Sequence, residues 1–124
     1  MLNNNLFHEE CHMKTSCSQS ETCPIITVHK IISGKWKILI LWHLSSKSLR
    51  FSELKRKLPD VTQRMLTNQL RALEDDGLIS RKVYPVVPPK VEYSLTDIGK
   101  EMIPLLKSMH KFGIMYSDSI NKKE

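Results

Sequence analysis

A helical pattern of leucines over residues 62–76 constrains the fold of this chain more than any other feature. At about 100° per residue, Leu66, Leu70 and Leu73 fall on one side, with Met65 and Ala72 at its edge. The opposite side carries Gln63, Arg64, Thr67 and Arg71, flanked by Asn68. Such polar heads suit base edges and phosphates, so the pattern predicts a helix that buries one apolar seam and presents a nucleic-acid-binding face.

Both ends of this predicted helix have local signals. Thr62 suits the N-cap, and Val61 before it can pack against Leu66 at the fourth helical position. Gly77 suits a left-handed residue after the last turn, which lets Leu78 fold back onto the helix.

The segments on either side predict a winged helix-turn-helix. A short helix, with Ser52 as its cap, precedes a tight break at 58–61, and residues 49–51 can add a short strand before it. After Leu78 the apolar period changes to two over residues 79–84 and 91–95, and a proline-stiffened loop joins these stretches. This hairpin would be a wing, on which Arg81, Lys82 and Lys90 would meet the DNA backbone or minor groove. Ordinary surface charge is the alternative interpretation of these three.

Further helices flank this motif. One is expected from Pro24 to Gly34, a second begins at Lys35, and a long final helix capped by Thr96 and bent by Pro104 closes the chain. The final helix carries a wide apolar stripe, made of Ile98, Met102, Leu105, Leu106, Met109, Phe112 and either Met115 or Tyr116. We interpret part of this stripe as a dimer interface, paired with the first helix. The predicted fold is mostly α with a small β-hairpin wing, comprising a tail (1–22), one DNA-binding and dimerisation domain (23–118) and a short tail (119–124).

The distribution of charge favours double-stranded DNA as the partner. Residues 33–95 hold twelve lysines and arginines against six acidic residues, so the whole net charge of +6 comes from the segment around the motif. Such an excess fits phosphate neutralisation with counterion release. The longest apolar run, 38–42, is too short to cross a bilayer, and the N-terminus has no secretion signal, so we expect no membrane partner and a cytoplasmic location.

Several longer stretches together resemble the HxlR family, bacterial winged-helix regulators similar to the MarR group. They are Trp36–Leu41, RFSEL at Arg50–Leu54, MLTNQLRALEDDGLISR at Met65–Arg81, VYPVVPPKVEYSLTDIG at Val83–Gly99, and a Cys-Pro pair at the start of the first helix. The resemblance covers about residues 23–116. It implies a homodimeric transcription factor, acting as a repressor, that binds an inverted repeat with half-sites about one helical turn, roughly 10 bp, apart.

The resemblance also implies roles for individual residues. Thr62, Gln63, Arg64, Thr67, Asn68 and Arg71 would lie in the major groove, whereas Arg50, Arg81 and Lys90 would contact the backbone and minor groove.

Some HxlR-type proteins sense oxidants or electrophiles through one cysteine at the start of the first helix, the place that Cys23 occupies. A thiol at a helix N-terminus gains thiolate character, although an unreactive cysteine in a reducing cytosol is the alternative. This chain departs from the one-cysteine pattern, because Cys11 and Cys17 precede Cys23 and two histidines, His8 and His12, lie nearby. The extra cysteines either resolve an oxidised Cys23 or form a metal site, but their spacing matches no structural zinc pattern, so no metal or cofactor is predicted.

Other function classes have less support in the sequence. A protein-interaction adaptor would use the same helices, but it would show no salt-dependent affinity for duplex DNA. An enzyme is not expected, because the four glycines do not cluster into a phosphate loop and no paired carboxylates share a buried face. A regulator that responds to a metal or a small ligand stays open as an alternative, and the effector is not predicted.

Overall fold

The computed structural model describes residues 23–122 of the 124-residue chain, which divides after Gly34 into two compact units. In the first unit, helix α2 (Pro24–Ile32) begins with proline, where the missing N–H group costs nothing. The carbonyl oxygen of its N-cap, Cys23, accepts the amide hydrogen of Thr27 at 3.0 Å. The chain leaves the helix at Ser33 and Gly34, and Gly34 has a φ of 93° that favours glycine.

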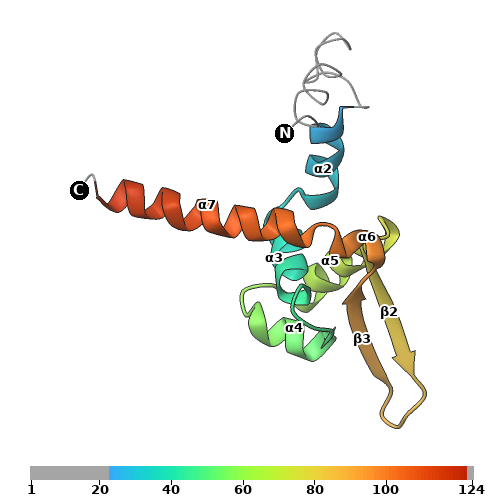
Figure 1. Cartoon of the computed structure of the whole chain (residues 1–124). Helices are drawn as coiled ribbons and strands as arrows, with labels where there is room; N and C mark the ends of the chain where they lie inside the picture. Colours follow the sequence, from blue (N-terminus) through green and yellow to red (C-terminus); the bar gives the residue numbers. More distant parts are fainter. Residues whose placement is uncertain (1–22, 123–124) are drawn as a thin grey trace. The chain divides into compact units, whose positions relative to one another are not determined.

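The second unit is mostly helical with one small sheet (Figure 1). Its elements are α3 (Lys35–Leu44), β1 (Leu49–Arg50), α4 (Phe51–Lys57), α5 (Gln63–Asp75), β2 (Ile79–Tyr84), β3 (Lys90–Leu95), α6 (Asp97–Lys100) and α7 (Ile103–Asn121). Helices α4 and α5 follow one another across a short break, and the β2–β3 hairpin projects beyond them (Figure 1). The predicted architecture, mostly α with a hairpin wing, is confirmed.

The core of this unit lies where α3, α4, α5 and the sheet meet. The completely buried side chains include Ile40 and Leu41 from α3, Leu54 from α4, and Leu66 and Leu73 from α5, each with an exposed fraction of 0%. Burying each such side chain contributes about 1.5–3 kcal/mol, so the predicted leucine seam of α5 supplies a large part of the core.

The sheet has the strand order β1-β3-β2, and both pairings are antiparallel. Arg50 of β1 and Lys82 of β2 both lie opposite Glu92 of the central strand, and Tyr84 lies opposite Lys90 at the end of the hairpin nearest the loop. Residues directly opposite one another share a face of a sheet, so this register decides which wing residues lie together.

The predicted cap of the first motif helix is wrong by two residues. Helix α4 begins at Phe51 with Arg50 as its N-cap, which places Ser52 inside the first turn. The Oε1 atom of Glu53 accepts the Arg50 amide hydrogen at 2.9 Å. Serine is a good cap by residue type, but Glu53 stands three residues after Arg50, where its carboxylate can reach the N-cap amide.

The predicted long final helix is two helices, α6 and α7, separated by a turn at Glu101 and Met102. Pro104 lies in the first turn of α7 and does not bend a continuous helix. In an unbroken helix the nitrogen of Pro104 would have to donate to the carbonyl of Lys100, the residue at which α6 ends. Proline has no N–H group and its ring would clash there, so the chain restarts the helix instead.

We expect Gly99→Ala to destabilise the chain. A Cβ atom at Gly99 would overlap the backbone carbonyl oxygen of Leu78, which also accepts the Thr96 amide hydrogen at 3.1 Å. Overpacking against backbone lowers the free energy of unfolding by about 1–3 kcal/mol. Chemical denaturation would measure this loss, with Gly113→Ala as the matched control.

A Cβ atom at Gly113 meets nothing within 4 Å, so this control should be neutral or stabilise helix α7 by about 0.5–1 kcal/mol. Equal stability of the two variants would contradict the close contact at Gly99.

We expect Glu53→Gln to lower the melting temperature at neutral pH but not in acid. The hydrogen bond from the Arg50 amide lowers the pKa of the Glu53 carboxyl below its ordinary value. A lowered folded-state pKa means that the stabilisation is present above the unfolded-state pKa and is lost as the pH falls through the folded-state pKa. Thermal melts at pH 7 and at about pH 3 would test this. A deficit of equal size at both pH values would rule out the ionised carboxylate as its source.

Candidate nucleic-acid interface

Helix α5 has both of the ends that the sequence predicts. The Thr62 hydroxyl accepts the amide hydrogen of Met65 at 3.0 Å, which satisfies one of the open amides of the first turn. At the other end Gly77 has a φ of 78°, and the amide of Leu78 donates to the carbonyl of Leu73 at 3.0 Å. This arrangement is a Schellman motif, and it ends the helix where the glycine stands.

The polar side of α5 faces solvent. All six residues predicted to lie in the major groove belong to it, and all are exposed except the half-buried Thr67: Thr62, Gln63, Arg64, Thr67, Asn68 and Arg71. The leucine seam is buried on the other side of the same helix, so the structure brings these six residues together on one accessible face.

Four of the six carry polar groups that no internal contact occupies. Thr62 caps the helix, and the Thr67 hydroxyl donates to the carbonyl of Gln63 at 2.8 Å. Within residues 23–122, the side chains of Gln63, Arg64, Asn68 and Arg71 make no hydrogen bond or ion pair. These two arginines and two amides can therefore bind a partner without breaking an interaction within this part of the chain.

The wing separates the three basic residues that the sequence groups together. Lys90 lies two residues from Glu92 on β3, and Arg50 lies directly opposite Glu92, so Arg50 and Lys90 share one face of the sheet. Arg81 lies opposite the buried Tyr93 and belongs to the other face. Its Nε atom is 3.8 Å from the Oε2 atom of Glu74 on α5. Arg81 therefore borders α5, whereas Arg50 and Lys90 lie on the other face of the sheet.

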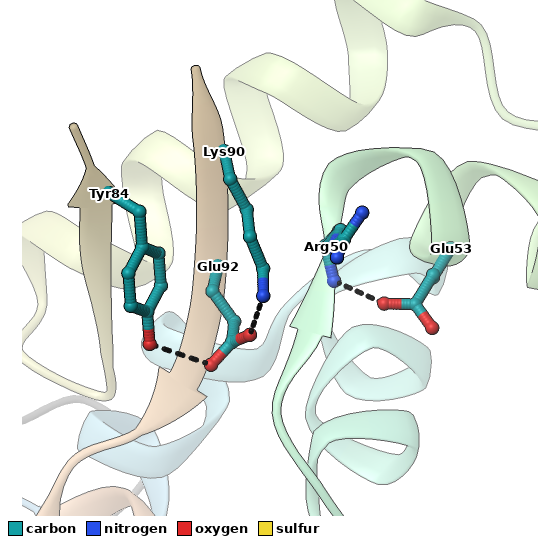
Figure 2. Close-up of polar contacts among 5 residues, drawn as sticks. All are labelled: Arg50, Glu53, Tyr84, Lys90 and Glu92. Atoms are coloured by element: carbon teal, nitrogen blue, oxygen red, sulfur yellow. Dashed lines mark hydrogen bonds and ion pairs between the residues drawn. The ribbon is translucent and has the colours of Figure 1, made fainter. Parts of the chain in front are cut away.

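Lys90 has two neighbours that the strand pattern alone does not identify, Glu92 and Tyr84. Glu92 lies with one carboxylate oxygen 3.6 Å from the Lys90 Nζ atom, and its other oxygen accepts a hydrogen bond from the Tyr84 hydroxyl at 3.4 Å (Figure 2). Figure 2 also shows the Arg50 amide held by Glu53 on the neighbouring element. Alternation along each strand predicts which residues of that strand share a face. Only the register across the hairpin shows that Tyr84 lies opposite Lys90.

Cys23 lies at the N-cap of α2, as predicted, and it is buried. Its sulfur takes part in a disulfide bond. The other two cysteines of the sequence, Cys11 and Cys17, lie outside the described residues, as do His8 and His12. Among residues 23–122, no three His, Cys, Asp or Glu side chains gather into a set that could hold a metal ion.

Helix α7 buries Leu106 and leaves most of its apolar residues exposed. The exposed ones on α6 and α7 are Ile98, Leu105, Met109, Phe112, Ile114, Met115, Tyr116 and Ile120. Where α7 meets α3, His110 stacks on Trp42 with ring centroids 4.9 Å apart, beside an open apolar hollow of about 260 Å³. No helix within the described part of the chain is both long and apolar enough to span a membrane.

Comparison with known proteins places this chain in a family. The model of the HxlR-like helix-turn-helix family matches residues 31–121. The chain is 50% identical over 109 residues to the uncharacterized HTH-type transcriptional regulator YdeP of Bacillus subtilis, a match covering 88% of this chain and 85% of YdeP. It is 52% identical over 94 residues to an uncharacterized HTH-type transcriptional regulator of Methanothermobacter thermautotrophicus, covering 76% of this chain and 72% of that protein.

Solved structures of similar chains agree with this placement. The redox regulator HypR in its oxidized form matches with a TM-score of 0.72 and 46% identity, covering 75% of this chain and 96% of HypR. HypR in its reduced form matches with a TM-score of 0.76 and 43% identity, covering 80% and 98%. The chain therefore belongs to the HxlR family of winged helix-turn-helix transcriptional regulators.

Proposed function

We propose that the chain binds DNA in a sequence-specific manner and represses transcription as a homodimer on an inverted repeat. The observation that carries this proposal is the exposed polar side of α5, with its two arginines and two amides unoccupied by internal contacts and the basic wing beside it. An adaptor that binds only proteins would have no need for such a polar side together with a basic wing.

In this proposal α5 lies in the major groove. Arg64 and Arg71 present guanidinium groups, which pair in a bidentate manner with the O6 and N7 atoms of guanine. Gln63 and Asn68 present amides, which pair with the N6 and N7 atoms of adenine. The Thr62 hydroxyl accepts an amide hydrogen of the helix and keeps its O–H group to donate to a phosphate or a base. The Thr67 hydroxyl donates to the helix backbone and keeps acceptor capacity for a base amino group at the groove edge.

The wing and the start of α4 would supply contacts to the phosphate backbone. Arg50 and Lys90 act from one face of the sheet, and Arg81 acts from the face that borders α5 once it gives up its contact with Glu74. These contacts fix the position of the protein on the duplex, whereas the residues of α5 carry the sequence information.

Dimerisation would use the exposed apolar side of α7 together with α2. Apolar side chains repeat along α7 from Leu105 to Ile120, and the Phe112 and Tyr116 rings stack with centroids 6.1 Å apart. Contiguous apolar surface on this scale marks an interface. A twofold dimer presents two copies of α5 to half-sites about 10 bp apart, which explains an inverted repeat as the target.

We further propose that a disulfide at Cys23 controls DNA binding. Support comes from the disulfide bond of Cys23 and from the redox regulator HypR, which has been solved in oxidized and reduced forms. In the sensing step, two cysteine thiols form one S–S bond and transfer two electrons and two protons to an oxidant such as a diazene or a peroxide. The second sulfur belongs to Cys11, Cys17 or a cysteine of the other subunit.

Replacing an α5 arginine should reduce sequence discrimination. The target would first be selected from a pool of random duplexes, and fluorescence anisotropy would then compare that target with a scrambled duplex at fixed salt. Arg64→Ala or Arg71→Ala should reduce the difference in binding free energy between the two duplexes by about 1–3 kcal/mol. The reason is that the variant loses the bidentate contact that distinguishes guanine from the other bases.

Arg56→Ala is the matched control, since it removes the same charge from an exposed position on α4 and should leave the ratio unchanged. A wild-type chain that selects no sequence and binds no duplex would favour the adaptor function and contradict the proposal.

Oxidation should abolish binding to the selected duplex, and a thiol should restore it. Anisotropy would be measured before and after diamide and again after dithiothreitol, for wild type and for Cys23→Ser. The variant should bind DNA and be insensitive to diamide, whereas Cys11→Ser and Cys17→Ser tested singly would identify the second sulfur. A Cys23→Ser variant that still responds to diamide would refute regulation through Cys23. A wild-type chain that binds its duplex equally with and without diamide would refute redox regulation and direct attention to a small ligand at the Trp42–His110 hollow.

A further inference from the structure

One face of the wing combines three cations, one aromatic ring and one carboxylate. The register places Arg50 and Lys82 on either side of Glu92, and it places Tyr84 opposite Lys90. Since positions two apart on a strand share a face, all five side chains lie on the same side of the sheet. We call this set, Arg50, Lys82, Tyr84, Lys90 and Glu92, the basic wing face.

The Tyr84 ring lies close to the ammonium groups of two lysines. The Nζ atoms of Lys82 and Lys90 each lie 4.9 Å from the centroid of the Tyr84 ring. The ring face attracts an ammonium group, so it offsets part of the repulsion between the two lysines. Two ammonium groups held near one ring, with Arg50 across the sheet, form a binding surface for a phosphodiester, whose oxygens can accept hydrogen bonds from several donors.

Glu92 is the single acidic residue of this face, and it occupies the position that an anion would take. One carboxylate oxygen lies 3.6 Å from the Lys90 Nζ atom, and the other accepts the Tyr84 hydroxyl hydrogen (Figure 2). The side chains of Lys90 and Glu92 are 32% and 27% exposed, so an incoming phosphate can reach both of them. In the protein without DNA, the Glu92 carboxylate therefore partly neutralises the charge of the Lys90 ammonium group.

We propose that the basic wing face binds a DNA phosphate and that Glu92 limits DNA affinity by competing with that phosphate for Lys90. The inference rests on the proposed function, because it names a further residue that acts at the DNA-binding surface. In wild type the Glu92 carboxylate stays beside the Lys90 ammonium and keeps phosphate oxygens from it, and the competition involves no proton transfer and no change of covalent bonds. Because every duplex has the same phosphates, Glu92 weakens binding to all sequences by a similar factor.

The test compares wild type with Glu92→Gln on the selected and the scrambled duplex over a range of salt concentrations. The variant should bind both duplexes more tightly and by a similar factor, because Lys90 is then free to neutralise a phosphate. Each additional neutralised phosphate steepens the slope of log K against log salt by about 0.9, so the gain should be roughly three- to fourfold larger at about 50 mM than at about 200 mM salt.

Three further variants separate this mechanism from others. Glu92→Thr removes the same carboxylate with a residue that suits a strand, and it should reproduce the effect if Glu92→Gln folds poorly. Glu101→Gln removes one negative charge from an exposed position at the end of α6, so it measures the effect of net charge alone. Adding Lys90→Met to Glu92→Gln should abolish the steeper slope, since the effect acts through Lys90.

The outcomes also distinguish this inference from the proposed function. Wild-type chain that binds its selected duplex while both Glu92 variants keep the wild-type slope, or bind more weakly, would overturn the role of Glu92 and leave the regulator intact. A gain of the same size for Glu101→Gln would overturn it too. Wild-type chain that binds no duplex would refute the proposed function and, with it, this inference.

Discussion

Burial of the leucine seam determines which side chains α5 presents to solvent. Leu66, Leu70 and Leu73 are each at most 1% exposed, and burying a leucine contributes about 1.5–3 kcal/mol, whereas an N-cap contributes about 1 kcal/mol. Rotating the helix about its axis would expose this seam and bury Arg64 or Arg71 without a partner, at a large cost in desolvation. The polar side of α5 therefore faces outward because the leucines face inward.

Most of α5 and its surroundings can be predicted from the sequence because each signal is local. A period of 3.6 residues, a threonine at the N-cap and a glycine after the last turn lie within one segment, and all three are present in the structure. Two predictions of helix ends are wrong because local signals compete with one another. Ser52 is a good cap by type, but Glu53 selects Arg50 as the N-cap, and Pro104 begins a new helix where a bend in one helix was expected.

The wing shows what local signals cannot provide. Alternation along β2 places Arg81 and Lys82 on opposite faces of the sheet. It does not say which of these faces carries Lys90 of the neighbouring strand. The pairing of Tyr84 with Lys90 decides this, because Tyr84 shares its face with Lys82. The same register brings Glu92 between Arg50 and Lys82, so the carboxylate in this basic surface becomes visible only in three dimensions. The described residues contain only one of the three cysteines, and the sequence itself leaves their pairing open.

In the proposed function, α5 and the wing contribute to DNA recognition in different ways. Side chains of α5 without internal partners can distinguish bases, and the wing supplies positive charge that can contact the phosphates of any duplex. The most direct measurement replaces the purines of the selected duplex with 7-deaza analogues, which lack the N7 acceptor of the major groove but keep the phosphate backbone. We predict that substitution within each half-site greatly weakens binding, because arginine and amide side chains pair with N7. Unchanged affinity on the fully substituted duplex would contradict major-groove reading by α5.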